Sequence, residues 1–279
     1  MVSQNVQKII IGTASLALFA LIWELVAILV ALSLKDNLNW ELSSILIAIH
    51  EGNYFYLPRF SSVIAAFFKV VQTSVFFNDV GISMYHFLIG FAGALILGIP
   101  IGMIMGWFPF FDKALSPIVE IFRPIPPLAW IPFAIIWLKL THQAAGFIIF
   151  MGMVFPIILS TYSGFKNVPK IYVEAAKVLG SVSSGKLIRY IAAPAASPMI
   201  LSGIRTAMGV GWMCLAASEM FGVSDSGIGY KIWFHYGIQA MDYVVVYMLI
   251  LGFIGLLLDF LFRYFLQNRL LKWQTGTVV

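Results

Sequence analysis

Charged residues are scarce in this chain. Lys, Arg, Asp and Glu together make up 10 % of its 279 residues, whereas a soluble domain carries about 25 %. Hydrophobic residues make up 61 % of the chain, and the mean hydropathy is +0.95. So few charges cannot cover a surface that faces water. The composition therefore excludes a soluble globular domain and predicts an integral membrane protein.

Cysteine is also nearly absent. Cys214 is the single cysteine, so no disulfide can form within the chain. Glycine, by contrast, is common: the 23 glycines are spread through apolar runs, as is usual for transmembrane helices. In a membrane protein the net charge of +5 matters less than its distribution between loops. No nucleic-acid partner is expected.

Long apolar runs dominate the sequence, and a helix needs about 20 apolar residues to cross a bilayer. We therefore expect an all-α integral membrane protein with six transmembrane helices. The first run is longer than the roughly 7 to 15 apolar residues of a signal peptide, which favours an uncleaved anchor. Residues 35–79 are predicted to be an external interfacial segment, partly helical. The six runs lie near residues 9–34, 82–106, 116–138, 143–163, 198–222 and 242–266.

The distribution of Lys and Arg predicts the orientation, because positive residues beside short loops stay in the cytoplasm. If the N-terminus lies inside, most of the Lys and Arg residues fall on that side, and both termini are cytoplasmic. The loop at residues 164–197 is the most basic one and contains a single acidic residue, Glu174. The basic residues assigned to the inside are Lys8, Lys113, Arg123, Lys166, Lys170, Lys177, Lys186, Arg189, Arg205, Arg263, Arg269 and Lys272.

The basic loop is too long to be only a turn between two spans. Apolar residues recur at helical spacing after Pro169, and Gly180 can end a helix in a left-handed conformation, so a short amphipathic helix is predicted there. One or two further turns are expected at 186–191, before Pro194 and Pro198 open the next span. The alternative is a basic loop held against anionic lipid head groups.

Residues 180–187 approach a phosphate-binding loop, Gly-x-x-x-x-Gly-Lys-[Ser/Thr], but Leu187 stands where a hydroxyl should reach magnesium. The preceding segment is also a predicted helix and not a buried strand. The near match is therefore attributed to chance. If ATP is used, another chain must bind it.

Several separated motifs carry a resemblance to a known family. Glu174-Ala175-Ala176, followed by Gly180 and Pro194, resembles the EAA loop of ABC importer permeases. With four further blocks in the same order, residues from about 57 to about 273 resemble the nitrate/sulfonate/bicarbonate (taurine-type) permeases. The stretch from Gly180 to Pro194 is one residue longer than the usual pattern. The further blocks are Pro-Ile-Pro-Pro-Leu-Ala-Trp-Ile-Pro at 124–132, Phe-Pro-Ile at 155–157, Ser-Glu-Met with Gly-Ile-Gly-Tyr at 218–220 and 227–230, and Gly-Leu-Leu-Leu-Asp at 255–259.

This resemblance implies a type I ABC importer permease fold and a non-catalytic subunit in the plasma membrane of a prokaryote. It implies a homodimer, two cytoplasmic ABC ATPase subunits that hold ATP and magnesium, and an external solute-binding protein. The imported solute would be small and usually anionic, and alternating access would move it through the bilayer. The residues that would couple transport to the ATPase are Glu174, Ala175, Ala176, Lys177 and Gly180.

The expected domains follow from the same comparison. Residues 1–79 would form an N-terminal anchor and external segment. Residues 80–273 would form a core permease domain of five spans with the EAA loop at 164–197, and residues 274–279 would form a cytoplasmic tail.

The candidate translocation pathway rests on prolines, aromatics and rare polar residues inside the spans. The prolines at 124–127 free backbone carbonyls and interrupt the third span, either as a pathway element or as a structural kink. Arg205 could act electrostatically or snorkel to the interface, and either tryptophan could simply pack. The candidates are Pro126, Pro127, Trp130, Arg205, Trp212, Ser218 and Glu219, with Ser218 and Glu219 placed near the outer mouth where a binding protein would dock.

Three further expectations concern side-chain contacts. Gly98, Gly102 and Gly106 repeat every four residues and should let another helix approach closely. Glu120 and Arg123 are three residues apart and can pair on one helix face, as a structural ion pair or, alternatively, as a contact for an anion. His86 and His142 appear as lone interfacial histidines, because neither has a second metal ligand at usable spacing, and no metal site is predicted.

The sequence gives less support to two other classes of function. An ion-gradient-coupled secondary transporter should carry carboxylates near the bilayer midplane and a repeat between its halves, and Glu24 alone fits the first requirement. A membrane-embedded enzyme should show convergent catalytic residues, and no zinc-protease, paired-acid or serine-elbow pattern is present.

Overall fold

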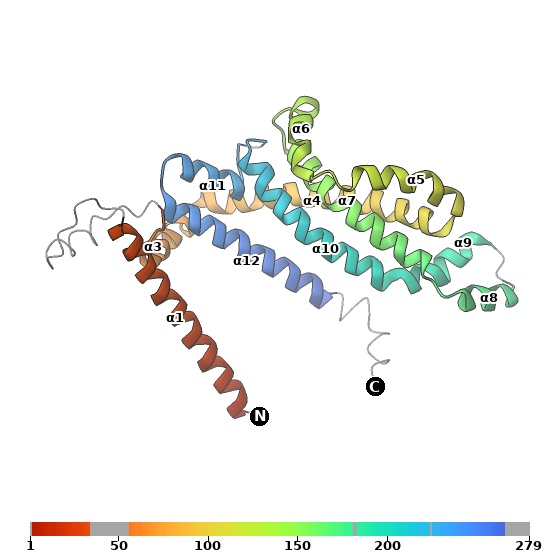
Figure 1. The fold of residues 1–279 in the computed structure, drawn as a ribbon, viewed down its shortest axis with the longest axis horizontal. Helices are drawn as coiled ribbons and strands as arrows, with labels where there is room; N and C mark the ends of the chain where they lie inside the picture. Colours follow the sequence, from red (N-terminus) through yellow and green to blue (C-terminus); the bar gives the residue numbers. More distant parts are fainter. Residues whose placement is uncertain (1, 34–55, 181–182, 224, 266–279) are drawn as a thin grey trace. The chain divides into compact units, whose positions relative to one another are not determined.

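The computed structural model describes residues 2–33, 56–180, 183–223 and 225–265, and every regular element within these ranges is a helix (Figure 1). Residues 34–55, which include part of the predicted interfacial segment, and the predicted tail at 274–279 lie outside the described residues. In chain order the elements are α1 (Val2–Ser33), α3 (Phe60–Val71), α4 (Ser74–Trp107), α5 (Pro109–Phe122), η1 (Pro127–Trp130), α6 (Ile131–Leu138), α7 (His142–Lys166), α8 (Lys170–Val178), α9 (Ser184–Leu187), η2 (Ile188–Ala192), α10 (Ala193–Met220), α11 (Ile228–Gly237) and α12 (Met241–Phe265).

Five of the described helices are long and apolar enough to cross a membrane, and a bent pair of helices raises the count to six if it forms one span. The bent pair is the predicted third span. Its axis turns by 86° between Pro109–Phe122 and Pro127–Leu138. Pro124, Pro126 and Pro127 fall in this bend, where they supply no backbone N–H for an α-helical ladder. The predicted interruption of the third span is confirmed.

The fifth span differs from its prediction. The prolines were expected to open a new helix, but one helical run extends over Ser184–Met220, with a π-helical turn at Ile188–Ala192. Pro194 follows this turn directly. A proline ring clashes with the carbonyl four residues earlier, and a wider π-turn is one way for a helix to continue past it.

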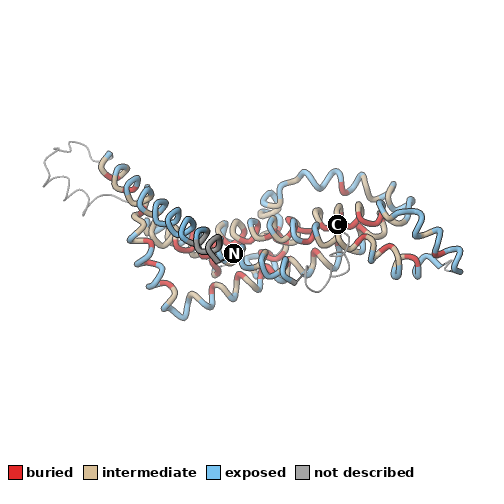
Figure 2. Tube along the Cα trace, turned by 90° about the horizontal axis from the view of Figure 1, so that it is seen from below, coloured by how far each residue is buried: buried red, intermediate tan, exposed pale blue. Residues whose placement is uncertain are grey.

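The chain divides into two compact units. The first contains Met1–Asn78 and Lys231–Ile250. In it, the Arg59 Nε atom lies 2.8 Å from Glu24 Oε1, and the Ser61 hydroxyl donates to the same carboxylate at 3.0 Å. Figure 2 shows α1, which begins at the N mark, mostly in the colour of exposed residues. Glu24 is therefore held in an ion pair on a largely apolar helix.

The second unit contains Asp79–Tyr230 and Leu251–Val279, and α7 lies at the centre of its core. The predicted glycine stripe on α4 packs against α7: a Cβ added to Gly102 would lie 2.5 Å from the Ile158 carbonyl oxygen, and one added to Gly106 would lie 2.7 Å from the Phe165 Cβ atom. Close packing at this stripe is confirmed. On its other side α7 packs against α10, where Gly203 meets the Ser160 side chain.

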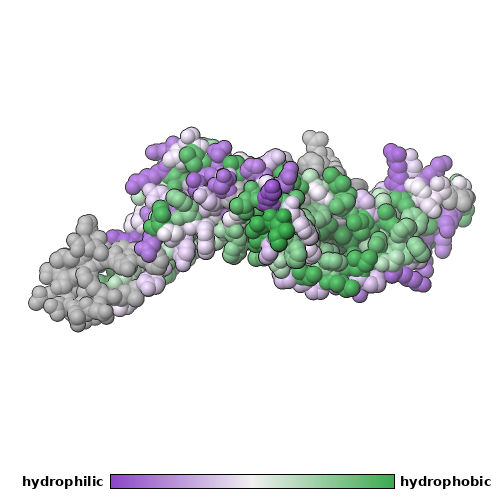
Figure 3. Space-filling model, turned by 90° about the horizontal axis from the view of Figure 1, so that it is seen from above, coloured by the Kyte–Doolittle hydropathy of each residue, from purple (hydrophilic) through white to green (hydrophobic). Residues whose placement is uncertain are grey.

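Large apolar side chains remain exposed on the outside of the long helices. Ile96 of α4 and Leu256 of α12 are examples, and apolar side chains cover much of the face drawn in Figure 3. A water-soluble protein seldom exposes contiguous apolar surface on this scale, whereas lipid tails accept it. The exposed surface thus agrees with the expected all-α membrane fold.

Candidate functional site

A pocket with a volume of about 450 Å³ lies beside the break in the third span. It is formed by the end of α5, by η1, and by the facing surfaces of α7 and α10. Arg123, Ser160 and Thr206 contribute its polar side chains. The other lining residues are Ile125, Pro127, Met151, Gly152, Phe155, Pro156, Leu159 and Val210.

Arg123 is exposed and lines this pocket, and among the described residues no acidic side chain forms an ion pair with it. The predicted pair with Glu120 is wrong: no ion pair joins these two side chains, although both belong to the described part of the chain. The break explains this, because Arg123 is the C-cap of α5 and directly precedes the proline segment. Its guanidinium group is therefore available to a ligand in the pocket.

The other candidates at the break have different surroundings. Pro127 lines the pocket and begins η1, while Pro126 precedes η1 in an extended conformation. Trp130 stacks on Phe122 with ring centroids 6.0 Å apart and meets Phe147 edge-on at 6.4 Å. Trp130 thus packs within an aromatic group, while a direct contact with solute stays a prediction.

Arg205 and Trp212 line a second pocket, of about 340 Å³, between α10 and α12. Arg205 donates two hydrogen bonds to Asp259, at 2.7 and 3.1 Å, and Arg263 donates to the same carboxylate at 2.9 Å. The Trp212 Nε1–H group donates to the Leu251 carbonyl at 3.0 Å. Both side chains therefore hold α10 against α12, and their role in a pathway stays a prediction.

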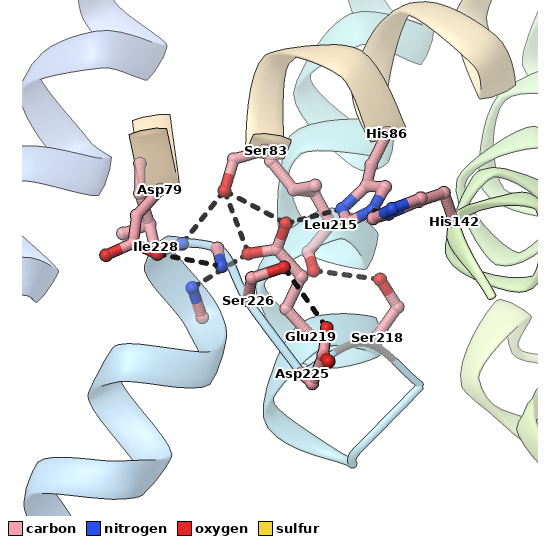
Figure 4. A network of polar contacts seen from close by, with 12 residues as sticks. Asp79, Ser83, His86, His142, Leu215, Ser218, Glu219, Asp225, Ser226 and Ile228 are labelled. Carbon is pink, nitrogen blue, oxygen red and sulfur yellow. Dashed lines mark hydrogen bonds and ion pairs between the residues drawn. The ribbon is translucent and has the colours of Figure 1, made fainter. Parts of the chain in front are cut away.

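Ser218 and Glu219 are fully buried at the end of α10. The Ser218 hydroxyl donates to the Leu215 carbonyl of its own helix at 2.9 Å. The Glu219 carboxylate accepts hydrogen bonds from the Ser83 hydroxyl at 2.9 and 3.0 Å and lies 2.8 Å from His86 Nδ1 (Figure 4). In this structure neither side chain is presented at an open mouth, where a docking protein was expected to meet them.

The same carboxylate anchors the loop between α10 and α11. The Gly229 N–H group donates to Glu219 at 2.8 Å, and the Ile228 N–H group donates to the Ser83 hydroxyl at 2.9 Å. Gly227 has a φ of +116°, and its Cα atom faces the carboxylate so closely that an added Cβ would lie 2.5 Å from Glu219 Cδ. The Ser-Glu-Met and Gly-Ile-Gly-Tyr motifs thus belong to one arrangement.

His86 and His142 are not isolated. His86 Nε2 lies 2.8 Å from His142 Nδ1, so the two rings form a hydrogen-bonded chain to Glu219. The interpretation as lone histidines is wrong, because spacing along the sequence does not reveal that the ends of α4 and α7 meet. Among the residues that the structure describes, no group of three or more His, Cys, Asp or Glu side chains could hold a metal ion.

Part of this network was detectable in the sequence. Asp79, Ser83 and His86 occur at spacings of four and three residues within an apolar run, which places them on one face of a helix. A polar stripe on an apolar helix indicates buried polar partners. Which residue they meet could not be predicted, because Glu219 is more than 130 positions away in the sequence.

The EAA segment forms the predicted short helix. α8 begins after Pro169 and spans Lys170–Val178, and Gly180 follows with a φ of +89°. Glu174, Ala175 and Lys177 are exposed. Ala176 is only 9 % exposed and, with Ala175, lines a pocket that also contains Tyr190 and Pro194 of the same chain. The small size of Ala176 therefore serves packing within this chain.

The bent third span, the exposed α8 helix and the apolar exterior together define a class: an all-helical protein with several candidate membrane spans. Residues 98–270 match the family described as binding-protein-dependent transport system inner membrane component, and the chain belongs to this family. It is therefore a multi-pass inner membrane component of an ABC importer and a non-catalytic subunit, and the family implies that a partner ATPase hydrolyses ATP.

Similar proteins extend the comparison. A Methanocaldococcus jannaschii protein named as an ABC transporter permease is 38 % identical over 239 residues, which cover 84 % of this chain and 87 % of that protein. The bicarbonate transport system permease of Synechocystis sp. is 38 % identical over 61 % of this chain and 60 % of its own. The taurine transport system permease of Escherichia coli is 32 % identical over 68 % of each chain.

A solved structure supports the fold. A chain of the MetNI methionine ABC transporter, determined in inward-facing conformations, superposes with a TM-score of 0.54 at 19 % identity over 68 % of this chain and 92 % of that one. The predicted family and the all-helical importer permease fold are confirmed. The secondary-transporter and membrane-enzyme alternatives are wrong, and Glu24, the carboxylate that favoured the first of them, is paired with Arg59.

Proposed function

We propose that this permease imports a small oxyanion such as nitrate, bicarbonate or a sulfonate. The observation that carries the proposal is the pocket beside the break, where Arg123 faces no acidic partner among the described side chains and the Ser160 and Thr206 hydroxyls line the same space. Relatives named for bicarbonate, nitrate and taurine support the same solute class.

The chemistry of these groups suits an oxyanion. A guanidinium group offers five N–H donors in a planar fork that matches two oxygens of one anion, and hydroxyls add further donors. The rest of the pocket is mainly apolar, with Ile125, Phe155 and Val210 among its lining residues. An apolar wall strengthens the attraction between a single cation and its ligand, because it lowers the local dielectric constant. With a single cation in the pocket, the anion is also bound weakly enough to dissociate and continue through the permease.

The expected assembly is a homodimer with the translocation path between the two copies, on two ATPase subunits, with a solute-binding protein outside. We place both termini in the cytoplasm, because that orientation puts most Lys and Arg residues inside. α8 then lies on the cytoplasmic side. The division into an anchor at 1–79, a core at 80–273 and a tail at 274–279 is retained as part of this proposal.

α8 is proposed as the helix that couples ATPase movement to the spans. Val178 and Leu179 are both 87 % exposed, and Ile171 and Tyr172 are exposed as well. Apolar side chains outside the spans indicate a protein partner. Glu174 and Lys177 are the exposed charges that would meet that partner, and Gly180 permits the reversal after the helix with its positive φ.

Charge reversal at α8 tests the coupling. We expect Glu174→Lys to lower ATP-dependent uptake by more than about tenfold, because a like-charge contact at the interface with the ATPase is unfavourable. Membrane insertion and yield should stay unchanged. The matched control is Ser184→Lys, an exposed position in α9. Uptake that survives Glu174→Lys would exclude Glu174 from the coupling contact.

Competition during uptake tests the solute class. The chain, purified with the ATPase and solute-binding protein of its own system, is reconstituted into proteoliposomes and supplied with labelled bicarbonate, nitrate or taurine. The proposal predicts ATP-dependent uptake of at least one of them, with inhibition by the other small oxyanions. Uptake restricted to neutral or cationic solutes would contradict the proposal, although it would leave the family assignment intact.

A further inference from the structure

The network around Glu219 is not explained by solute binding or by ATPase coupling. Glu219 and His86 are both 0 % exposed, and among the described residues His86 is the ion-pair partner of Glu219. Burial of an ionised carboxylate is costly unless the charge is compensated. The protons held by Glu219 and its neighbours therefore determine how costly the burial is. They also determine how stably the loop at Gly227–Gly229 is held.

The contacts fix most of the proton positions. An ionised Glu219 needs donors, and it has the Ser83 O–H group, the Gly229 N–H group and His86 Nδ1–H. The Ser83 oxygen in turn accepts from the Ile228 N–H group. With its Nδ1 atom donating, neutral His86 has an acceptor at Nε2, and His142 Nδ1 must then donate to it.

The charge balance requires one more proton. With both histidines neutral, the ionised Glu219 carboxylate is a buried negative charge with no proton beside it to compensate. One proton on the His142–His86 pair, or on Glu219 itself with the histidine hydrogen bonds reversed, compensates this charge. His142 is exposed at the first residue of α7, so this proton can enter from the surface and act on Glu219 through His86.

Among the described residues, no Lys or Arg forms an ion pair with Glu219. Asp79 of α4 is 2 % exposed and accepts from the Gly227 N–H group at 3.4 Å. Tyr85 meets the His142 ring edge-on at 5.8 Å, and the loop carries Asp225, which accepts from Ser226. Two of these groups are further carboxyls, which increases the need for a proton on the histidines.

We infer that Glu219, His86 and His142 form a proton-dependent latch that holds the Gly227–Gly229 loop against α4. In the latched state the loop is hydrogen-bonded to Glu219 and Ser83, and the network carries one proton. In the released state these bonds are broken and the histidines are solvated, so the proton is lost at a pH where solvated histidine is neutral. By linkage, the state that binds more protons is favoured at lower pH and loses stability as the pH rises. Glu219 lies in the last turn of α10, which also carries Thr206 of the pocket, so the latch fixes one end of a pathway helix.

Hydrogen exchange of the latched amides tests this inference on the full chain in detergent, without any transported solute. The peptide that contains Ile228 and Gly229 is followed by mass spectrometry between about pH 6.5 and about pH 8.5, where solvated histidine becomes neutral. After correction for the intrinsic exchange rate, protection of these amides should fall by about tenfold as the pH rises, because one proton separates the two states.

Three variants sharpen the test. Glu219→Gln removes the buried charge and should keep the amides protected equally at both pH values. His142→Asn keeps an N–H donor beside His86 but cannot hold the proton, so protection should already be low near pH 6.5. His235→Asn is the matched control: its ring stacks on Tyr243, and the variant should retain the pH dependence of the parent chain.

A pH-independent protection in the parent chain would overturn the latch. So would an unchanged pH dependence in both Glu219→Gln and His142→Asn, because the network would then serve only as a structural contact.

Discussion

Arg123 and Glu219 are two charged residues in the same unit with opposite surroundings. Arg123 is exposed, lies beside a broken helix and has no acidic partner among the described side chains. Glu219 is fully buried, lies at the end of a continuous helix and has at least three hydrogen-bond donors. The Arg123 guanidinium group is left available to a ligand, whereas the Glu219 carboxylate already forms its hydrogen bonds within the chain.

This difference distinguishes a charge that can bind solute from a charge that attaches one part of the chain to another. A charge that already satisfies its hydrogen bonds within the chain gains little from a passing solute, because the internal contacts would have to be lost first. An unpaired cation in a partly apolar pocket gains much from an anion. The sequence alone predicts a pathway role for Glu219, and for Arg123 a structural ion pair with an anion contact as the alternative. We propose the anion contact for Arg123 and an attachment role for Glu219.

The largest expected effect comes from the loop glycine that faces Glu219. Gly227→Ala should lower the stability of the protein by at least about 3 kcal/mol, because an alanine is strained at a φ of +116° and its Cβ would overlap the Glu219 carboxyl carbon. The thermal unfolding midpoint and the yield in detergent measure this loss.

The matched control for that substitution is Gly222→Ala. Gly222 also has a positive φ, +75°, but no atom lies within 4 Å of an added Cβ. The conformational strain alone should cost about 1 kcal/mol. Equal losses at the two positions would show that the contact with Glu219 does not determine the need for Gly227.

A smaller loss is expected when the carboxylate itself is removed. Glu219→Ala leaves the Gly229 N–H group and His86 without their buried acceptor, which should cost about 3 kcal/mol at most. Glu219→Gln keeps an acceptor and should cost about 1 kcal/mol. A comparison of unfolding midpoints checks the order, and an alanine variant as stable as the glutamine variant would contradict the anchoring role of this side chain.

Much of the architecture was accessible from the sequence. Apolar runs of sufficient length predicted the spans, prolines at 124–127 predicted the break, and the four-residue glycine repeat predicted the α4–α7 contact, because each depends on local chemistry. The start of the fifth span was mispredicted. A proline rule that assumes a helix boundary does not allow for a π-turn such as Ile188–Ala192.

The side-chain partners were less accessible. Glu120 and Arg123 have suitable spacing for a pair, yet the pair does not form, because Arg123 lies at the helix end where the chain changes direction. Ser83, His86 and His142 meet Glu219 only through tertiary packing of α4, α7 and α10. Spacing along one helix predicts which residues share a face, but not what that face meets.

The measurement that tests the central contrast most directly is the KM for oxyanion uptake by Arg123→Gln in reconstituted complexes. We predict a rise in KM of about tenfold, since a hydrogen bond to a charged group contributes about 1.5 kcal/mol, with an unchanged unfolding midpoint and a smaller rise for Arg123→Lys. Lys113→Gln, an exposed cation on the same helix, should leave KM unchanged. A KM for Arg123→Gln equal to that of the parent chain would contradict the assignment of Arg123 to the solute.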